Sequence, residues 1–219
     1  MIKVFNFDQK KLSNSSDFSC NTFVVGEENG PCVVIDLGEN EGKVINYILK
    51  HHTSCLGLLL THGHFDHIRG ISKFLQKFNC TVFIDEKDKE MLENPKKNCS
   101  LIFNEKVSFF LNNLYLLDDE DEINFGNKYY FKVIETPFHT NGSVCYLLKS
   151  ENALFTGDTL FKGSIGRTDL PEGNEKLIKN SLKKLYNLDR NLNVYPGHGP
   201  NSTLSHEFNT NIYFKNLGE

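Results

Sequence analysis

The sequence Leu56-Gly-Leu-Leu-Leu-Thr-His-Gly-His-Phe-Asp-His67 joins an apolar run to a cluster of histidines and an aspartate. The run from Leu56 to Leu60 has the length and composition of a short buried β-strand. Directly after it, four side chains that bind metal ions well fall within six residues: His62, His64, Asp66 and His67. Side chains alternate between the faces of an extended segment, so His62 and His64 are expected to point the same way. The pattern predicts a metal-binding loop at the end of a strand.

Asp66 also has an ordinary structural explanation. The residues from Ile68 to Phe78 read as a helix, which places Asp66 and His67 near its N-terminus, where an aspartate is a common cap. A cap explains one polar residue, but it does not explain four ligand-type residues at this spacing after an apolar strand. We therefore interpret the loop as a metal site.

Length and composition indicate a globular protein with a sizeable core. The chain has 219 residues, of which 39% are hydrophobic and 18 are phenylalanine. A single domain over residues 1–219 is the simplest expectation for this length. The net charge is −4 and no block of Lys or Arg stands out, which argues against nucleic acid as the main partner.

The sequence shows no sign of export or membrane insertion. Met1 to Asp8 reaches an acidic residue before any long apolar run. No window approaches the ~20 apolar residues of a membrane span. We therefore expect a cytoplasmic protein without a membrane partner. Its six scattered cysteines are then expected to be reduced and mostly buried.

Periodicity predicts strands and helices in alternation, which indicates an α/β protein. The segment around Leu56–Leu60 reads as a βαβ unit, so we expect a mostly parallel inner sheet. Residues 95–117 read as an irregular surface segment, and the acidic run 118–122 as a solvated turn. The predicted strands are 2–7, 21–25, 32–36, 56–60, 81–84, 129–136, 143–149, 153–156 and 193–195, and the predicted helices are 41–51, 68–78, 86–93, 174–187 and 203–214. This order predicts two similar halves whose sheets pack face to face.

Three later residues extend the ligand set. His139, Asp158 and His198 each lie on a glycine-bearing loop at the end of a predicted strand, where functional residues tend to collect. A lone histidine in such a loop is more often a turn residue or a satisfied core histidine. Together with the cluster at residues 62–67, however, these three side chains would complete the coordination of two metal ions.

The whole set of motifs resembles the metallo-β-lactamase-fold hydrolases, and within them the short type II glyoxalase-like (hydroxyacylglutathione hydrolase-like) group. The resemblance implies a four-layer αββα sandwich of two mixed β-sheets, with a dinuclear site at one edge of the sheets. It rests on Thr61–His67, Thr136–Gly142, Thr156–Phe161, Gly166–Pro171 and Tyr195–Pro200.

The resemblance also implies how the ligands divide. His62, His64 and His139 would hold one metal ion. Asp66, His67 and His198 would hold the second, and Asp158 would bridge both. Imidazole and carboxylate ligands without a thiolate suit Zn²⁺, and also Fe or Mn. The expected cofactor is two Zn²⁺ per chain.

The implied activity is hydrolysis of S-2-hydroxyacyl thioesters by a metal-bridging hydroxide. Two such ions lower the pKa of a shared water from ~15.7 toward ~7. The leaving thiol has a pKa near ~8.5, so it needs no dedicated acid. Asp66 and Asp158 are the predicted catalytic residues.

Substrate contacts are expected after the Gly-Asp loop. Lys162 and Arg167 could bind a carboxylate, Arg167 through two parallel hydrogen bonds. Alternatively, Arg167 pairs with Asp169 or braces the turn 163–166. Asn98 and Ser100 are weaker candidates for the cleft. Longer glyoxalases add a C-terminal helical domain that contacts glutathione, whereas this sequence ends soon after Pro200, so those contacts are not expected here.

Three other functions compete with this reading. A persulfide dioxygenase, which uses one Fe(II) held by two His and one Asp, resembles the chain around Gly166–Asp169. Such enzymes usually have Pro-Ala-His-Asp where this chain has Pro196-Gly-His-Gly199. A nuclease needs a basic surface or a clamping insertion, and the sequence has neither. A non-catalytic binding protein is disfavoured by the seven intact ligand positions. The acyl group, the thiol carrier and the oligomeric state stay open.

Overall fold

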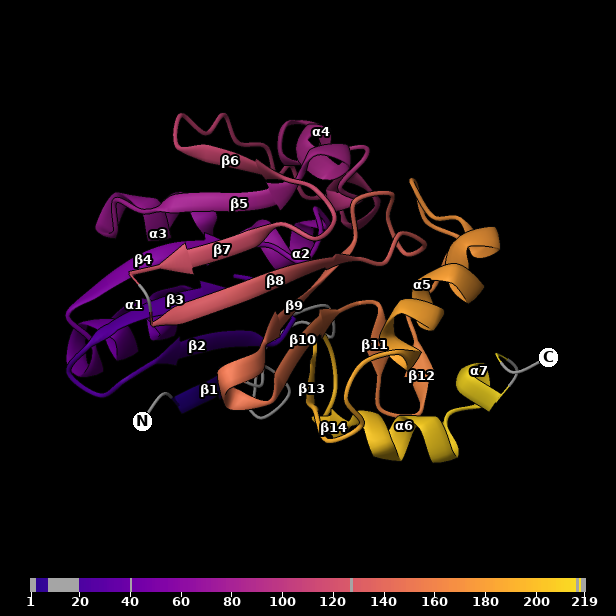
Figure 1. Cartoon of the computed structure of the whole chain (residues 1–219). Helices are drawn as coiled ribbons and strands as arrows, with labels where there is room; N and C mark the ends of the chain where they lie inside the picture. The colour runs from indigo at the N-terminus through magenta and orange to yellow at the C-terminus, as the bar shows by residue number, and fades with distance from the viewer. Residues whose placement is uncertain (1–2, 8–19, 40, 127, 216, 218–219) are drawn as a thin grey trace.

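The computed structural model describes residues 3–7, 20–39, 41–126, 128–215 and 217. Its first large sheet has the strand order β1-β2-β3-β4-β5-β6 (Figure 1). The antiparallel part comprises β1 (Lys3–Phe7), β2 (Thr22–Gly26) and β3 (Pro31–Ile35). The parallel part continues from β3 through β4 (Ser54–Leu59), β5 (Thr81–Asp85) and β6 (Leu114–Leu117). The predicted βαβ unit thus lies in the parallel half of a mixed sheet.

The second large sheet has the order β14-β13-β10-β9-β8-β7. The strands β8, β10 and β13 run in one direction, because β9 is antiparallel to both β8 and β10 and β13 is parallel to β10. A separate hairpin pairs β11 (Leu160–Phe161) with β12 (Ser164–Ile165). The strands of this sheet are β7 (Glu122–Phe125), β8 (Tyr129–Glu135), β9 (Val144–Leu148), β10 (Ala153–Gly157), β13 (Asn193–Pro196) and β14 (Ser202–Thr203).

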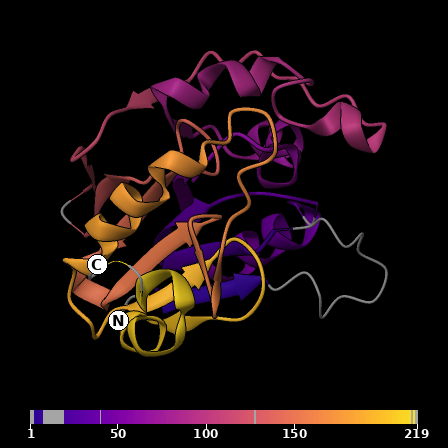
Figure 2. The same ribbon diagram turned by 90° about the vertical axis from the view of Figure 1, so that its right-hand side faces the viewer.

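Helices cover the outer faces of both sheets. In the turned view of Figure 2, the orange α5 lies on one side of the strands and the indigo α1 on the other. None of the helices in the described ranges is long and apolar enough to cross a membrane. They are α1 (Glu41–His51), α2 (Phe65–Ile68), α3 (Ile71–Lys77), α4 (Lys89–Glu93), α5 (Ile178–Tyr186), α6 (Leu204–Thr210) and α7 (Ile212–Lys215).

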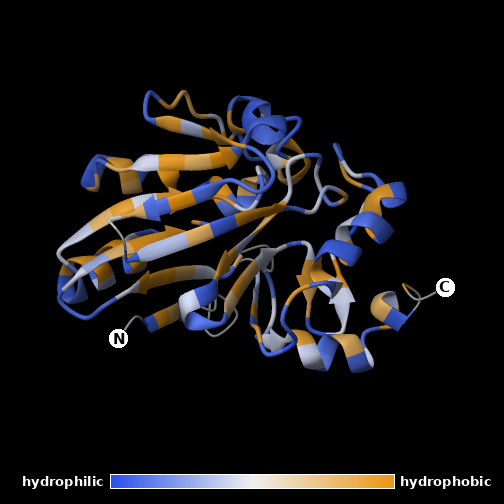
Figure 3. Cartoon of the chain, viewed as in Figure 1, coloured by the Kyte–Doolittle hydropathy of each residue, from blue (hydrophilic) through white to orange (hydrophobic). Residues whose placement is uncertain are grey.

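Three hydrophobic clusters define the layers. One lies between the two sheets, where Phe23 and Ile35 meet Phe131, Tyr146 and Phe155. Neighbouring residues in the same strands face outward, because side chains alternate along a strand. These outward residues pack under α1 and α3 in the second cluster and under α5, α6 and α7 in the third. Figure 3 shows the corresponding apolar colour along the strands. The predicted αββα sandwich is confirmed, and all six cysteines are buried and free.

Several predicted boundaries were wrong because of contacts distant in sequence. The helix predicted at 68–78 begins at Ile71 as α3, and α2 ends before it at Ile68. Between them the Gly70 amide donates to the Leu37 carbonyl at 3.0 Å, and a Cβ on Gly70 would lie 2.5 Å from the Gly38 carbonyl oxygen. The helix predicted at 203–214 breaks at Asn211, whose amide donates to the Ser164 carbonyl. The segment 95–117 was predicted to be irregular, yet its end forms the edge strand β6, which pairs with β5.

The site-bearing loops all follow strands that end at the same edge. The strands β3, β4 and β5 are parallel in one sheet, and β8, β10 and β13 run together in the other. Contacts between the sheets bring these two edges together. The Val144 amide donates to the Thr61 carbonyl at 2.9 Å, and the Tyr146 hydroxyl donates to the Leu60 carbonyl at 2.6 Å. The carboxyl ends of six strands therefore surround one region, a typical position for a functional site.

The Tyr146 hydroxyl offers a test of this connection. Tyr146→Phe leaves the buried Leu60 carbonyl without this donor, so we expect the free energy of unfolding to fall by about 1–3 kcal/mol. The matched control is Tyr186→Phe, since Tyr186 is 44% exposed, and its effect should stay below about 0.5 kcal/mol. Urea unfolding followed by circular dichroism measures both. Equal stability of the two variants would contradict the assigned role of the hydrogen bond.

Candidate metal centre

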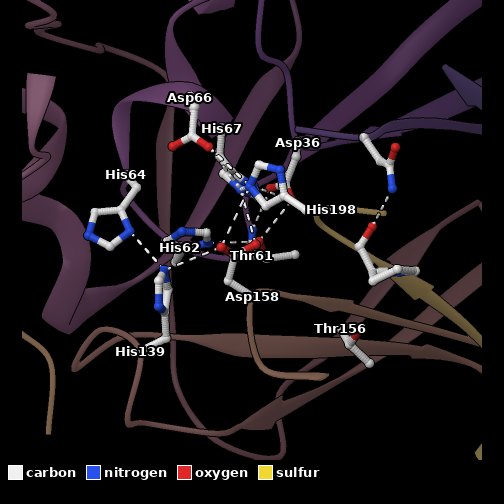
Figure 4. A network of polar contacts seen from close by, with 12 residues as sticks. Asp36, Thr61, His62, His64, Asp66, His67, His139, Thr156, Asp158 and His198 are labelled. Carbon is white, nitrogen blue, oxygen red and sulfur yellow. Dashed lines mark hydrogen bonds and ion pairs between the residues drawn. The ribbon is translucent and has the colours of Figure 1, made fainter. Parts of the chain in front are cut away.

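The loop that follows β4 presents its polar side chains toward the second sheet (Figure 4). His62 and His64 come from an extended backbone, with His64 at φ −66° and ψ 147° directly before α2. Both imidazoles are buried. The α2 helix then turns Asp66 and His67 to the other part of the site. The loop therefore presents two pairs of side chains, His62 with His64 and Asp66 with His67, as the sequence analysis expected.

His62, His64 and His139 form the first cluster, with ligand atoms that all lie within 4.8 Å of one another. The His64 Nδ1 atom is 2.9 Å from the His139 Nε2 atom. His139 Nδ1 lies 2.8 Å from the Arg167 carbonyl oxygen and must donate to it. That bond leaves the Nε2 lone pair of His139 directed toward His64.

Asp66, His67 and His198 form the second cluster, again within 4.8 Å. The Nε2 atoms of His67 and His198 are 3.3 Å apart. The Oδ2 atom of Asp66 lies 3.1 Å from His198 Nε2 and 3.7 Å from His67 Nε2. These three side chains come from α2 and from the loop after β13.

Asp158 lies between the two clusters. Its Oδ2 atom is 3.5 Å from His139 Nε2 and 3.6 Å from His198 Nε2, and its Oδ1 atom is 3.3 Å from His67 Nε2. The close approach requires Gly197, because a Cβ there would lie 2.3 Å from Asp158 Oδ1. The structure thus brings together all seven side chains that the sequence analysis proposed as metal ligands.

The donor set fits metal ions. His62 Nε2, His64 Nε2 and Asp158 Oδ1 are buried and have no hydrogen-bond partner among the described residues. Burying such atoms without partners costs about 1–3 kcal/mol each. Cations placed among the imidazole and carboxylate groups would satisfy His62 and Asp158, and the ligand types suit Zn²⁺, Fe or Mn.

The electrostatics favour neutral imidazoles in the first cluster, whereas in the second cluster neighbouring acidic groups outweigh burial and raise the pKa values of His67 and His198. Burial, reinforced by neighbouring His139, lowers the pKa of His64 to about 3. Burial likewise holds the pKa of His62 well below its usual value. Burial raises the pKa of Asp158, but His198 and His67 outweigh it and hold that pKa well below its usual range. Neutral imidazoles and an ionised carboxylate are the forms that coordinate metal.

A cavity of about 410 Å³ opens onto the two clusters. Arg167 lines it and also pairs with Asp169 through both carboxylate oxygens, at 2.6 and 2.7 Å. Lys162 is exposed and is not among the lining residues. Asn98 and Ser100 do not line the cavity either; the Asn98 amide instead donates to the carbonyls of Met91 and Val107. Their neighbour Cys99 does line the cavity.

Comparison with known proteins agrees with this geometry. The profile of the metallo-beta-lactamase superfamily matches residues 16–198. The chain belongs to the metallo-β-lactamase superfamily. A probable metallo-hydrolase from Streptococcus pyogenes is 34% identical over 189 residues, which cover 83% of this chain and 80% of the relative. Hydroxyacylglutathione hydrolase GloC from Haemophilus influenzae is 30% identical over 198 residues, which cover 90% and 93%.

Solved structures of the superfamily share the fold over nearly the whole chain. The BLEG-1 B3 metallo-β-lactamase has a TM-score of 0.86 at 30% identity, covering 98% of this chain and 99% of that one. The protein TTHA1623, in a di-iron-bound form, has a TM-score of 0.78 at 28% identity, covering 91% and 97%. These matches establish the metallo-β-lactamase fold, and the superfamily's metallo-hydrolases support the prediction of an enzyme.

Asp36 is a site residue that the sequence analysis missed. It directly follows β3 and has φ +52°. Its carboxylate accepts from the Thr61 amide and hydroxyl, each at 2.8 Å, and from His67 Nδ1 at 2.8 Å. The last bond leaves the His67 Nε2 lone pair facing the second cluster. The signal was present, because Asp36 follows an apolar strand just as the proposed ligands do.

Asp88, also missed, connects the loops of the first cluster. Its buried carboxylate accepts from the Gly63 amide at 2.9 Å, the Gly142 amide at 2.8 Å and the Thr140 hydroxyl at 2.7 Å. One side chain therefore ties the loop of His62 and His64 to the loop of His139. Its position inside the predicted helix 86–93 concealed this role.

Substitution of Asp36 tests the support of His67. Asn keeps the shape of Asp36 and tolerates positive φ, so Asp36→Asn removes charge without adding backbone strain. Because carboxylates that orient a ligating histidine raise its basicity, we expect zinc affinity to fall by about 10- to 100-fold. Titration against a chelator measures it, with the exposed Asp189→Asn as control. Unchanged affinity would disprove the role.

Proposed function

We propose that the chain is a binuclear-metal hydrolase that cleaves S-2-hydroxyacyl thioesters. The observation that carries the proposal is the pair of clusters, each offering three ligand atoms, with Asp158 between them in a third group that takes His62 from one cluster and His67 from the other. The sequence identity of 30% to the hydroxyacylglutathione hydrolase GloC, over 90% of the chain, supports the substrate class. A cavity of about 410 Å³ suits a small molecule, so we propose no nucleic acid or membrane partner.

The chain's own residues would hold and orient the reacting groups. His62, His64 and His139 would bind one ion, Asp66, His67 and His198 the other, and Asp158 both. Two divalent ions, when bound, would polarise the thioester carbonyl and supply a nucleophilic water at neutral pH. Asp66 and Asp158 would offset part of the positive charge of the ions. Zn²⁺ is the proposed metal, and the di-iron form of TTHA1623 makes iron a reasonable alternative.

A thioester matches the shortage of proton donors in the cavity. The lining carboxylates are Asp66 and Asp158, and both belong to the clusters. A thiolate with a pKa near ~8.5 leaves without prior protonation, whereas an amide nitrogen requires a proton. This argument favours thioester cleavage over the β-lactam cleavage that the name of BLEG-1 indicates for that protein.

Gly197 favours two ions over the single iron of a persulfide dioxygenase. That alternative usually has alanine at this position, and a Cβ on Gly197 would lie 2.3 Å from Asp158 Oδ1 and 2.7 Å from His67 Cε1. With glycine, Asp158 stays between the clusters, close to both His67 and His139. The packing therefore supports a bridging position for Asp158.

Metal analysis with a substrate panel tests the proposal. Purified protein should contain two zinc-type ions per chain and hydrolyse S-lactoyl thioesters, and removal of the ions by a chelator should abolish turnover. The panel should include glutathione and coenzyme A carriers and a β-lactam. One iron per chain with oxygen uptake on glutathione persulfide would overturn the proposal in favour of the dioxygenase.

The Asp158→Ala variant should lose both metal binding and thioester hydrolysis. Because Asp158 would bridge the ions, we expect bound metal to fall below one ion per chain and thioester turnover to become undetectable. Asp189→Ala, a change outside the site, should keep both. Metal content and turnover are measured on the same preparations, with circular dichroism to verify folding. Full activity in the Asp158 variant would refute the assignment.

A further inference from the structure

The cavity beside the clusters has an apolar wall built from three separate parts of the chain. Phe65 and Phe103 stack with ring centroids 5.0 Å apart, and both line the cavity. Phe161 and Ile165, from the β11–β12 hairpin, line it together with Leu170. Such a surface binds apolar groups because it removes them from water.

Away from the two clusters, the same cavity offers little to an anion. Apart from the cluster aspartates and histidines, Arg167 is the one charged residue among the described residues that line it. The Arg167 guanidinium already forms a bidentate pair with Asp169. The pair has no net charge, so a substrate carboxylate gains little from the Arg167 donors that Asp169 leaves free. Lys162, the other candidate cation, is exposed and outside the lining.

The geometry also assigns which half of a thioester meets this wall. The reacting carbonyl has to lie at the clusters, and a 2-hydroxyacyl group of three carbons is small beside a cavity of about 410 Å³. The larger thiol half must therefore occupy the remaining space, along the phenylalanines. We propose, on the basis of the hydrolase function proposed above, that the thiol half of the substrate is an uncharged apolar group rather than an anionic carrier such as glutathione.

The reaction is the same for either carrier. Water adds to the thioester carbonyl, and the C–S bond breaks. The sulfur leaves with the bonding electrons as a thiolate and takes up a proton released by the water. The acyl group leaves as the 2-hydroxy acid. Only the binding of the thiol half differs between carriers. The inference is therefore tested by comparing kcat/KM for thioesters that share one acyl group and differ in the thiol.

A matched pair of esters isolates the charge of the thiol half. S-lactoyl-4-methylbenzyl thiol and S-lactoyl-4-carboxybenzyl thiol have similar shape and reactivity, and they differ by one carboxylate. With zinc-loaded wild-type protein, we expect kcat/KM to be at least about tenfold higher for the methylbenzyl thioester than for the carboxybenzyl thioester. The carboxylate would be transferred to an apolar wall that offers it no separate positive charge. S-lactoylglutathione should also react more slowly than the methylbenzyl thioester.

Asp169→Asn separates the charge effect from shape. The change frees Arg167 to pair with the substrate carboxylate. Because both side chains are more than half exposed, at 62% and 67%, the gain for the carboxybenzyl ester should be about two- to fivefold. The methylbenzyl ester should be unaffected. Asp189→Asn, at an exposed position outside the cavity, should leave the ratio of the two esters unchanged.

Phe103→Ala tests the apolar wall itself. We expect kcat/KM for the methylbenzyl ester to fall about five- to tenfold, mainly through KM. The small ester S-lactoyl methanethiol should change less than twofold. Phe110→Ala is the matched control, since Phe110 is 80% exposed and does not line this cavity, and it should alter neither ester.

The outcomes distinguish this inference from the proposed function. If the zinc-loaded protein hydrolyses none of these thioesters, the hydrolase function fails, and the inference fails with it. If it hydrolyses them but prefers lactoylglutathione or the carboxybenzyl ester, or differs by less than tenfold, the hydrolase function stands and the inference is overturned. A preference of tenfold or more that narrows in Asp169→Asn supports it.

Discussion

The structure depends on one electrostatic constraint: buried imidazole and carboxylate groups from both sheets must converge with their lone pairs facing each other. Without metal ions such an arrangement is costly, as the unpartnered His62 and Asp158 atoms indicate. The chain offsets part of the cost with hydrogen bonds on the far side of the rings. Asp36 holds His67, the Arg167 carbonyl holds His139, and the Thr61 hydroxyl lies 3.1 Å from His62 Nδ1.

These outer contacts also explain why two sheets are needed. Asp36 follows β3 and fixes the loop after β4, so it orders the site within the first sheet. Asp88 follows β5, yet two of its three hydrogen bonds reach the loop after β8 in the second sheet. The sandwich core sets the distance between the sheets, and Asp88 fixes the position of one loop relative to the other. The site is therefore a product of the packing of the two sheets.

The sequence predicted the site better than the boundaries of the elements. Spacing alone indicated His62, His64, Asp66 and His67, which lie within six residues, whereas the three later residues became candidates only in combination with that cluster. Asp36 follows an apolar strand, as those three do, whereas Asp88 lies inside a predicted helix, and the role of each depends on partners 25 or more residues away. The break at Gly70 and the pairing of β6 likewise depend on contacts distant in sequence, with the Gly38 carbonyl and with β5. Local patterns do not contain that information.

Reactivity and selectivity are encoded in different parts of the chain. The seven side chains of the clusters come from loops whose positions are set by strand ends and by buried carboxylates. The cavity wall comes from η3 (Ser100–Phe103) and from the short hairpin β11–β12 with its following loop. These segments lie outside the two large sheets. The Arg167 carbonyl in the loop after the hairpin holds His139, whereas the side chains of Phe103 and Leu170 are apolar and have no group that could hydrogen-bond to the clusters. We therefore expect exchange of wall residues such as Phe103 and Leu170 to alter substrate binding while the chemistry at the clusters stays constant.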